Sequence, residues 1–240
     1  MSPTPIADNP EFGRLAVILA WISGFVDAVG YVLLDHIFTA NMTGNTVLLG
    51  IDLAEGNWTE ATRHAATIPL FILGAFIGAT LLDGLLRTRF GRGIIFGLET
   101  IMIGGFWLIG WWYAEDPTGG WRYHVMLALL TVSMGMHTVV LPRVAGKVVR
   151  TTFVTGTLTS LAEEAATGLA GRSRDASAAQ HRIVLAATWT AYLLGALAGG
   201  VAVRATGFTS VIFPVTLLAA LALFDAGSSH AEKRGEDGRA

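Results

Sequence analysis

The sequence predicts an all-α integral membrane protein with six transmembrane helices, arranged as two three-helix repeats of opposite orientation. Three observations support this fold class: an apolar composition, six apolar windows long enough to cross a bilayer, and two short motifs that occur in both halves. Of the 240 residues, 52% are hydrophobic and 14% are charged, and the mean hydropathy is +0.56. This apolar content exceeds that of an ordinary globular domain, so we expect the lipid bilayer to be the main partner of the chain.

Six windows of about 20 residues have the length needed to cross ~30 Å of hydrocarbon as helices. They run over residues 15–34, 65–86, 93–113, 123–141, 183–203 and 207–224. The segment before the first window carries Asp8 and Glu11 against the single base Arg14, which is unlike the basic start of a signal peptide. We therefore expect the first window to be retained as a membrane helix.

The basic residues are unequally distributed between the two ends of these predicted helices. Thirteen of the 16 Lys and Arg residues lie at the end that holds both termini and the second and fourth loops. The opposite end has Arg63, Arg122 and Arg204. Because Lys and Arg are retained in the cytoplasm, this asymmetry predicts a multi-pass protein of the cell inner (plasma) membrane with both termini cytoplasmic.

Two motifs recur in the same order and at similar places relative to the predicted helices. "MTGNTVLLGIDLA" at Met42 recurs as "VTGTLTSLAEEAA" at Val154, 112 positions later, and "LGAFIG" at Leu73 recurs as "LGALAG" at Leu194, 121 positions later. A unit of three helices has an odd number of crossings, so its copy must run through the membrane in the opposite sense. The sequence thus divides into a cytoplasmic tail at 1–14, a membrane domain at 15–224 with repeats at 15–113 and 121–224, and a disordered cytoplasmic tail at 225–240.

The repeated LGAxxG motif places two glycines one helical turn apart on the same face in each half. These are Gly74 and Gly78 in the first repeat, and Gly195 and Gly199 in the second. Small residues at this spacing let another helix approach closely. We therefore expect all four glycines to serve in helix packing.

The TG motifs stand where a membrane helix would be expected to end. Residues 45–54 are apolar but too short to cross, and ~12 helical residues span only ~18 Å. One interpretation is a pair of re-entrant helices whose amino ends meet near the bilayer centre and present backbone N–H groups to a solute. The other is a pair of amphipathic helices lying in the interface, with acidic side chains among the lipid head groups. Those acidic residues are Asp52, Glu55, Glu163 and Glu164.

Three ionisable residues within the windows are candidates for proton coupling. Asp27 lies near the middle of the first window, where a charge costs about 2.5–3.5 kcal/mol and needs a partner. Alignment of Gly24 with Gly135 places His137 next to the counterpart of Asp27, and one interpretation is that the two form a proton-binding pair. The alternatives are an Asp27 carboxylate that is hydrogen-bonded within the bundle and a His137 imidazole that bonds a backbone carbonyl. Glu99, a turn or two inside the third window, is the third candidate.

Several function classes have no support in the sequence. There is no cysteine, and the six histidines are scattered, so no metal cluster or cysteine nucleophile is predicted. Phosphate-binding, HExxH and GxSxG motifs are absent. We therefore expect no enzymatic activity, no cofactor and no nucleic-acid partner.

The stretches "SGFVDAVGYVLL", "FTANMTGNTVLLG" and "TTFVTGTLTSLA" resemble the YoaK-like family of bacterial inner-membrane proteins, also known as domain of unknown function 1275. The resemblance extends from Leu15 to Phe224. It implies a small multi-spanning bacterial membrane protein, and it implies no substrate.

The leading functional hypothesis is a secondary transporter or permease for a small solute, with proton coupling and a site at the interface of the two repeats. The predicted substrate-binding residues are Asp27, Asn41, Thr43, Gly44, Asn45, Thr155, Gly156 and Thr157. The alternative is a non-transporting structural or signalling protein that binds a partner or lipid through its TG segments. The sequence allows a homo-oligomer without specifying one, and it does not identify the solute.

Overall fold

The structure is a computed structural model that describes residues 10–85, 91–113, 120–140, 143–144, 147–148, 154–169 and 176–237. Its long helices are α1 (Pro10–Leu33), α3 (Trp58–Thr80), α4 (Gly91–Trp112), α5 (Gly120–Val140), α7 (Ala176–Thr206) and α8 (Ile212–Asp237). Two shorter helices are α2 (Met42–Glu55) and α6 (Val154–Leu169). A π-helical turn η2 (Leu81–Leu85) follows α3, and a 3₁₀ turn η3 (Gly207–Val211) joins α7 to α8. The short strands β1 (Arg143–Val144) and β2 (Lys147–Val148) form an antiparallel pair.

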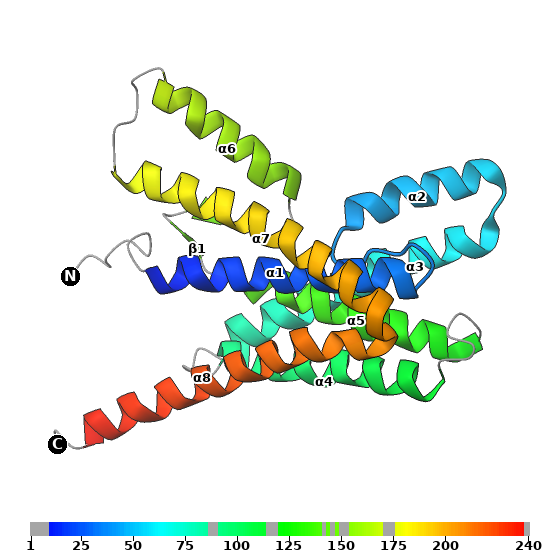
Figure 1. Ribbon diagram of the computed structural model, residues 1–240. Coiled ribbons are helices and arrows are strands. Elements are labelled where there is room, and N and C mark those ends of the chain that lie inside the picture. The colour runs from blue at the N-terminus through cyan, green and yellow to red at the C-terminus, as the bar shows by residue number, and fades with distance from the viewer. Residues whose placement is uncertain are drawn as a thin grey trace.

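Five segments of the described chain are long and apolar enough to cross a membrane. Four of them correspond to α1, α3 with η2, α4 and α5, and the fifth, Ala179–Asp225, contains parts of both α7 and α8. At Gly207 the backbone adopts a φ of 55°, which favours glycine, and Figure 1 shows the chain turning back there from α7 into α8. The protein is therefore a multi-pass membrane protein whose described residues are helical apart from the two-residue strands β1 and β2.

Two boundaries differ from the predicted ones. Helix α3 begins at Trp58, before the apolar window that starts at residue 65, because its second turn packs the polar side chain of His64 against Asp52 of α2. The tail predicted to be disordered from Asp225 is helical as far as Asp237. Six of these thirteen residues are Ala, Glu, Lys or Arg, which have high helix propensity, and extension of an existing helix avoids the cost of forming a new first turn.

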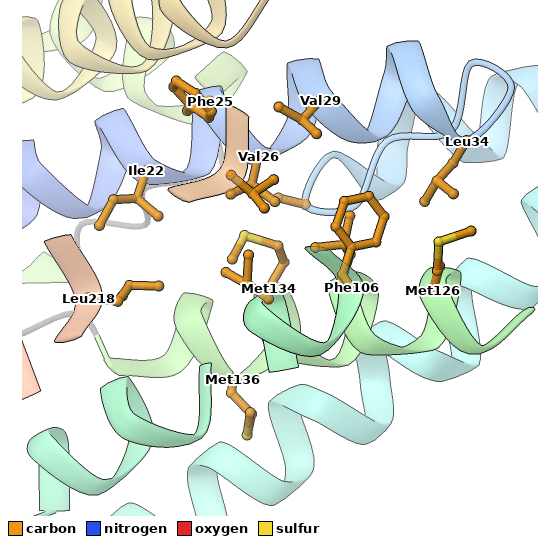
Figure 2. Packing of buried hydrophobic residues seen from close by; sticks show 14 of the residues in the cluster. Ile22, Phe25, Val26, Val29, Leu34, Phe106, Met126, Met134, Met136 and Leu218 are labelled. Atoms are coloured by element: carbon orange, nitrogen blue, oxygen red, sulfur yellow. The ribbon is translucent and has the colours of Figure 1, made fainter. Parts of the chain in front are cut away.

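The core lies where α1, α4 and α5 meet. Figure 2 shows Ile22 and Val26 of α1 pointing toward Met134 of α5, with Phe106 of α4 beside them. All four side chains are fully buried. Apolar side chains on the outside of α3 and α7, such as Phe76 and Leu197, are exposed and form a surface suited to lipid.

Close helix contacts join α1 to α7 and α3 to α5. A Cβ atom on Gly24 would lie 2.0 Å from the carbonyl oxygen of Tyr192, and one on Gly195 would lie 2.1 Å from that of Trp21. In the other pair, a Cβ atom on Gly74 would lie 2.1 Å from the carbonyl oxygen of Val132. Glycine is required at these positions because backbone meets backbone.

The remaining glycines of the repeated motif have similar surroundings. A Cβ atom on Gly78 would lie 3.1 Å from the Cα atom of Met136, and one on Gly199 would lie 2.6 Å from the carbonyl oxygen of Phe25. All four motif glycines therefore face the backbone of a neighbouring helix.

Candidate functional site

The segment after α1 folds back along that helix instead of leaving the bundle. Asp35 and His36 adopt left-handed φ values of 50° and 64°, which reverse the chain. The Oδ1 atom of Asp27 then accepts hydrogen bonds from the backbone N–H groups of Thr39 at 2.8 Å and Ala40 at 2.7 Å. Since Asp27 stands six residues before the end of α1, these amides lie ~9 Å back along the helix.

Asp27 is buried and all its contacts are made within the protein. Besides the two amides, the hydroxyl of Thr39 lies 3.3 Å from Oδ1. The hydroxyl of Tyr192 on α7 donates to Oδ2 at 2.7 Å. We call residues 34–41, between α1 and α2, the returning segment. The Asp27 carboxylate thus joins α1 to this segment and to α7, and it anchors the segment against both helices.

The first TG motif begins α2 and is fixed by two asparagines. The side chain of Asn41 caps the helix by accepting from the Gly44 backbone N–H at 3.2 Å. The buried amide of Asn45 accepts from the backbone N–H of Phe38 at 2.9 Å and donates to its carbonyl oxygen at 2.6 Å. A Cβ atom on Gly44 would lie 2.8 Å from the ring of Phe38, so the motif fits tightly against the returning segment.

The structure brings some predicted site residues together and separates others. Asn41, Gly44 and Asn45 hold the start of α2, whereas the side chain of Thr43 is exposed on its outer face. Asp27 contacts the segment just before the motif, at Thr39 and Ala40.

The second TG motif lies in the first turn of α6. Thr155 is exposed, Gly156 is partly buried and Thr157 is buried. Helix α6 packs on α7, as α2 packs on α3. Residues 149–153, which precede α6, lie outside the described residues.

A buried acid–imidazole pair links α4 to α5. The Nδ1 atom of His137 lies 2.8 Å from Oε2 of Glu99, and its Nε2 atom lies 3.0 Å from the carbonyl oxygen of Leu19. Neither side chain is exposed. The predicted pairing of His137 with Asp27 is therefore wrong, because Glu99 projects from α4 and occupies the imidazole that sequence alignment had assigned to Asp27.

The geometry of this pair determines how many hydrogens the His137 ring and the Glu99 carboxyl group share. The carbonyl of Leu19 can only accept, so Nε2 of His137 carries a hydrogen. The short distance between Nδ1 and Oε2 requires one more hydrogen, held by either the imidazole or the carboxyl group of Glu99. Among the described residues, Oε1 of Glu99 has no hydrogen-bond partner. The pair thus holds one transferable proton and one vacant acceptor.

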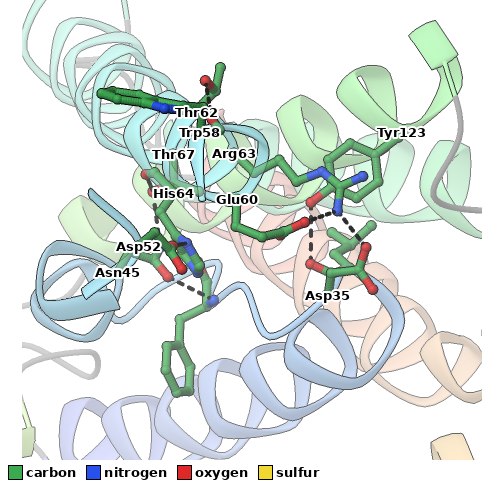
Figure 3. A network of polar contacts seen from close by, with 12 residues as sticks. Asp35, Asn45, Asp52, Trp58, Glu60, Thr62, Arg63, His64, Thr67 and Tyr123 are labelled. Carbon is green, nitrogen blue, oxygen red and sulfur yellow. Dashed lines mark hydrogen bonds and ion pairs between the residues drawn. The ribbon is translucent and has the colours of Figure 1, made fainter. Parts of the chain in front are cut away.

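A charged network closes the end of the bundle near the start of α3. Figure 3 shows Arg63 between Asp35, at 2.6 Å, and Glu60, at 2.8 Å. Its guanidinium also lies 4.4 Å from the ring centroid of Tyr123, whose hydroxyl donates to the Leu34 carbonyl at 3.2 Å. The network fixes the reversal after α1 to α3 and α5.

Sequence reasoning missed two further acid–histidine pairs. His64 of α3 bonds Asp52 of α2 at 2.7 Å, and His181 of α7 bonds Glu164 of α6 at 2.6 Å. The interfacial interpretation placed both acids among lipid head groups, but the structure pairs them with the following long helix. Asp52 and Glu164 are 112 positions apart, as the TG motifs are, which is the sequence signal that would have found them.

No group of three or more His, Asp or Glu residues suited to a metal ion occurs in the part of the chain that the structure describes.

Comparison with known proteins agrees with this membrane architecture. A model of the family described as "Protein of unknown function (DUF1275)" matches residues 15–224. The chain is also similar to "UPF0700 transmembrane protein YoaK" of Bacillus subtilis (strain 168), with 28% identity over 186 residues that cover 76% of this chain and 80% of the relative. No solved structure matches the chain.

Proposed function

The chain belongs to the DUF1275 family, and from this premise we propose that it is a secondary transporter or permease for a small solute. It crosses the inner membrane six times, has both termini in the cytoplasm, and consists of two repeats of opposite orientation. It has no enzymatic activity, and the solute site lies between the two TG segments.

The helix contacts support the repeat arrangement. Gly24 and Gly135 are 111 positions apart, and the residues they touch, Tyr192 and Phe71, are 121 positions apart. The same offsets relate the contact of Gly195 with Trp21 to that of Gly74 with Val132. Matched contacts of this kind are expected if α1 corresponds to α5 and α3 to α7.

The turn at Gly207 supports six crossings. The segment Ala179–Asp225 has 47 residues, and a helix of that length would extend ~70 Å, more than twice the ~30 Å of hydrocarbon. Because the chain turns back between α7 and α8 (Figure 1), two crossings account for it.

The observation that carries the transport proposal is the depth of the segment before α2. Backbone amides at Thr39 and Ala40 lie inside a membrane-spanning bundle and are satisfied by Asp27. Irregular backbone at such depth is tolerated in membrane proteins where protein or a water-filled path satisfies it, and it is typical of transporters with broken helices.

The orientation of the short helices supports a shared site. In Figure 1, α2 and α6 both begin in the middle part of the bundle's length and run toward opposite ends. Their amino ends carry the positive ends of the helix dipoles, which suit a carboxylate, another anion or a polar solute. Asn41, Thr43 and Gly44, with Thr155 and Gly156, are the proposed contacts.

Proton coupling is assigned to Glu99 and His137 in preference to Asp27. The pair holds one transferable proton, and Oε1 of Glu99 is free to accept another hydrogen bond among the described groups. Asp27 is engaged by four donors and acts as an anchor.

The test is a thermal-shift screen of the purified full-length protein against common metabolites and ions, followed by uptake of each stabilising solute into proteoliposomes. A ligand at 100 times its Kd stabilises by roughly 2.7 kcal/mol, which such a screen detects. Glu99→Gln should keep binding and lose the dependence of uptake on a pH gradient. Stabilisation without uptake would instead favour the alternative of a signalling or structural protein.

A further inference from the structure

Each short helix makes a partly buried acid–histidine bond to the long helix that follows it. The Nδ1 to carboxylate distance is 2.7 Å for His64 and Asp52, between α3 and α2, and 2.6 Å for His181 and Glu164, between α7 and α6. In both pairs the histidine side chain is 4% exposed and the acid 14%. The two pairs are therefore alike in geometry and burial.

The acids of the two pairs hold corresponding positions, whereas the histidines are 117 positions apart, about one helical turn short of the 121 that relates α3 to α7. Asp52 is ten residues from the start of α2 at Met42, and Glu164 is ten residues from the start of α6 at Val154. Each bond thus fastens its helix ~15 Å away from the TG motif, at the far part of the helix.

Buried polar residues lie on the inner faces that these bonds hold in place. Under α2, the Asn45 amide donates to the hydroxyl of Thr67 on α3 at 3.0 Å. On α6, the matching residue Thr157 is buried, and Thr188 of α7, 121 positions after Thr67, is buried as well. If α2 separated from α3, or α6 from α7, these buried polar side chains would become accessible to water and to a solute.

The imidazoles carry a cost in this arrangement. In the described residues, the Nε2 atoms of His64 and His181 are buried without a hydrogen-bond partner. An unpaired buried polar atom favours any state in which water reaches it. The Nδ1 bond therefore holds each short helix in place, while the unpaired Nε2 atom of the same ring favours its release.

We propose that the two acid–histidine pairs are matched latches, and that release of one latch lets its short helix move away from the bundle independently of the other. His64 and His181 are positioning residues in this scheme. The inference rests on the proposed function in one respect: opposite repeats place the two latches on opposite sides of the membrane, so their separate release gives alternating access.

Single cysteines test the latches directly, because the natural sequence contains no cysteine. Thr67→Cys reports on α2 and Thr157→Cys on α6, both in the full-length protein in lipid vesicles. His64→Gln should raise the rate of modification at position 67 by at least about tenfold, the change expected from loss of one charge-assisted hydrogen bond, and leave position 157 unchanged. His181→Gln should give the reverse.

The matched control is His124→Gln, because His124 is exposed and its ring bonds the Gly120 carbonyl of its own helix. It should change neither rate. Exchange of the two partners, Asp52→His with His64→Asp, should restore the low rate at position 67 if the bond itself is the latch.

Two results would overturn the inference: no change at either reporter, or an equal rise at both for each variant, which would indicate a general loss of stability. The assay needs no solute. If each latch controls its own reporter and no solute is ever carried, the transport proposal fails and the latches stand; if uptake is found and the reporters do not respond, the latches fail alone.

Discussion

Asp27→Ala is expected to destabilise the protein about twice as much as Tyr192→Phe. The reason is that the Asp27 carboxylate accepts hydrogen bonds from the returning segment as well as from Tyr192. Removal of the acid leaves the backbone N–H groups of Thr39 and Ala40 buried without an acceptor. Each such loss costs about 1–3 kcal/mol, so the free energy of unfolding should fall by about 2–6 kcal/mol. Tyr192→Phe removes one bond to a carboxylate and should cost about 1.5–3 kcal/mol.

Asp27→Asn separates anchoring from ionisation. The amide oxygen can accept from the backbone of Thr39 and Ala40, and the amide nitrogen can donate to the hydroxyl oxygen of Tyr192, since a hydroxyl both donates and accepts. The cost should then be about 1 kcal/mol, the net value of one ordinary hydrogen bond. If Asp27 is an anchor, this variant also keeps proton-dependent uptake.

Reversible unfolding of the purified variants in mixed micelles, followed through the fluorescence of the seven tryptophans, provides the measurement. The expected order of stability is wild type, Asp27→Asn, Tyr192→Phe, Asp27→Ala. The reasoning is refuted if Asp27→Ala is as stable as Tyr192→Phe, because the returning segment would then not depend on the carboxylate. Loss of coupled uptake in a stable Asp27→Asn protein would return the proton-binding role to Asp27.

Three further predictions concern packing and orientation. Gly195→Ala should cost about 1–3 kcal/mol by thermal unfolding, since its Cβ would lie 2.1 Å from a backbone oxygen, whereas Gly200→Ala has open space and should be neutral or gain up to about 1 kcal/mol. Gly44→Ala should cost about 1–2 kcal/mol against the ring of Phe38, and the additional change Phe38→Leu should recover part of it; no recovery would contradict this contact. A green fluorescent protein fused after Asp237 should fluoresce and a phosphatase fused there should be inactive, as cytoplasmic termini require; the opposite pattern would reverse the proposed orientation.

The sequence by itself determined that this is a membrane protein and which glycines lie at close helix contacts. Apolar windows report burial in lipid because each residue contributes to transfer free energy independently of the fold, and the family assignment confirms the resemblance stated from the motifs. Glycines four residues apart predicted close helix contact, although the partner helices were not identifiable from spacing. The depth of the TG segments was also left open, because a short apolar helix has the same composition whether it enters the bilayer or lies on it.

Tertiary structure alone decided which polar groups meet. Glu99 and His137 are 38 positions apart and Asp27 and Tyr192 are 165 apart, so neither pair has a local pattern. A buried side chain takes as its partner the nearest group that completes its hydrogen bonds, and that choice depends on the angle and register at which helices pack. Composition and periodicity fix which face of a helix is buried, whereas only the packed bundle fixes which atom lies opposite.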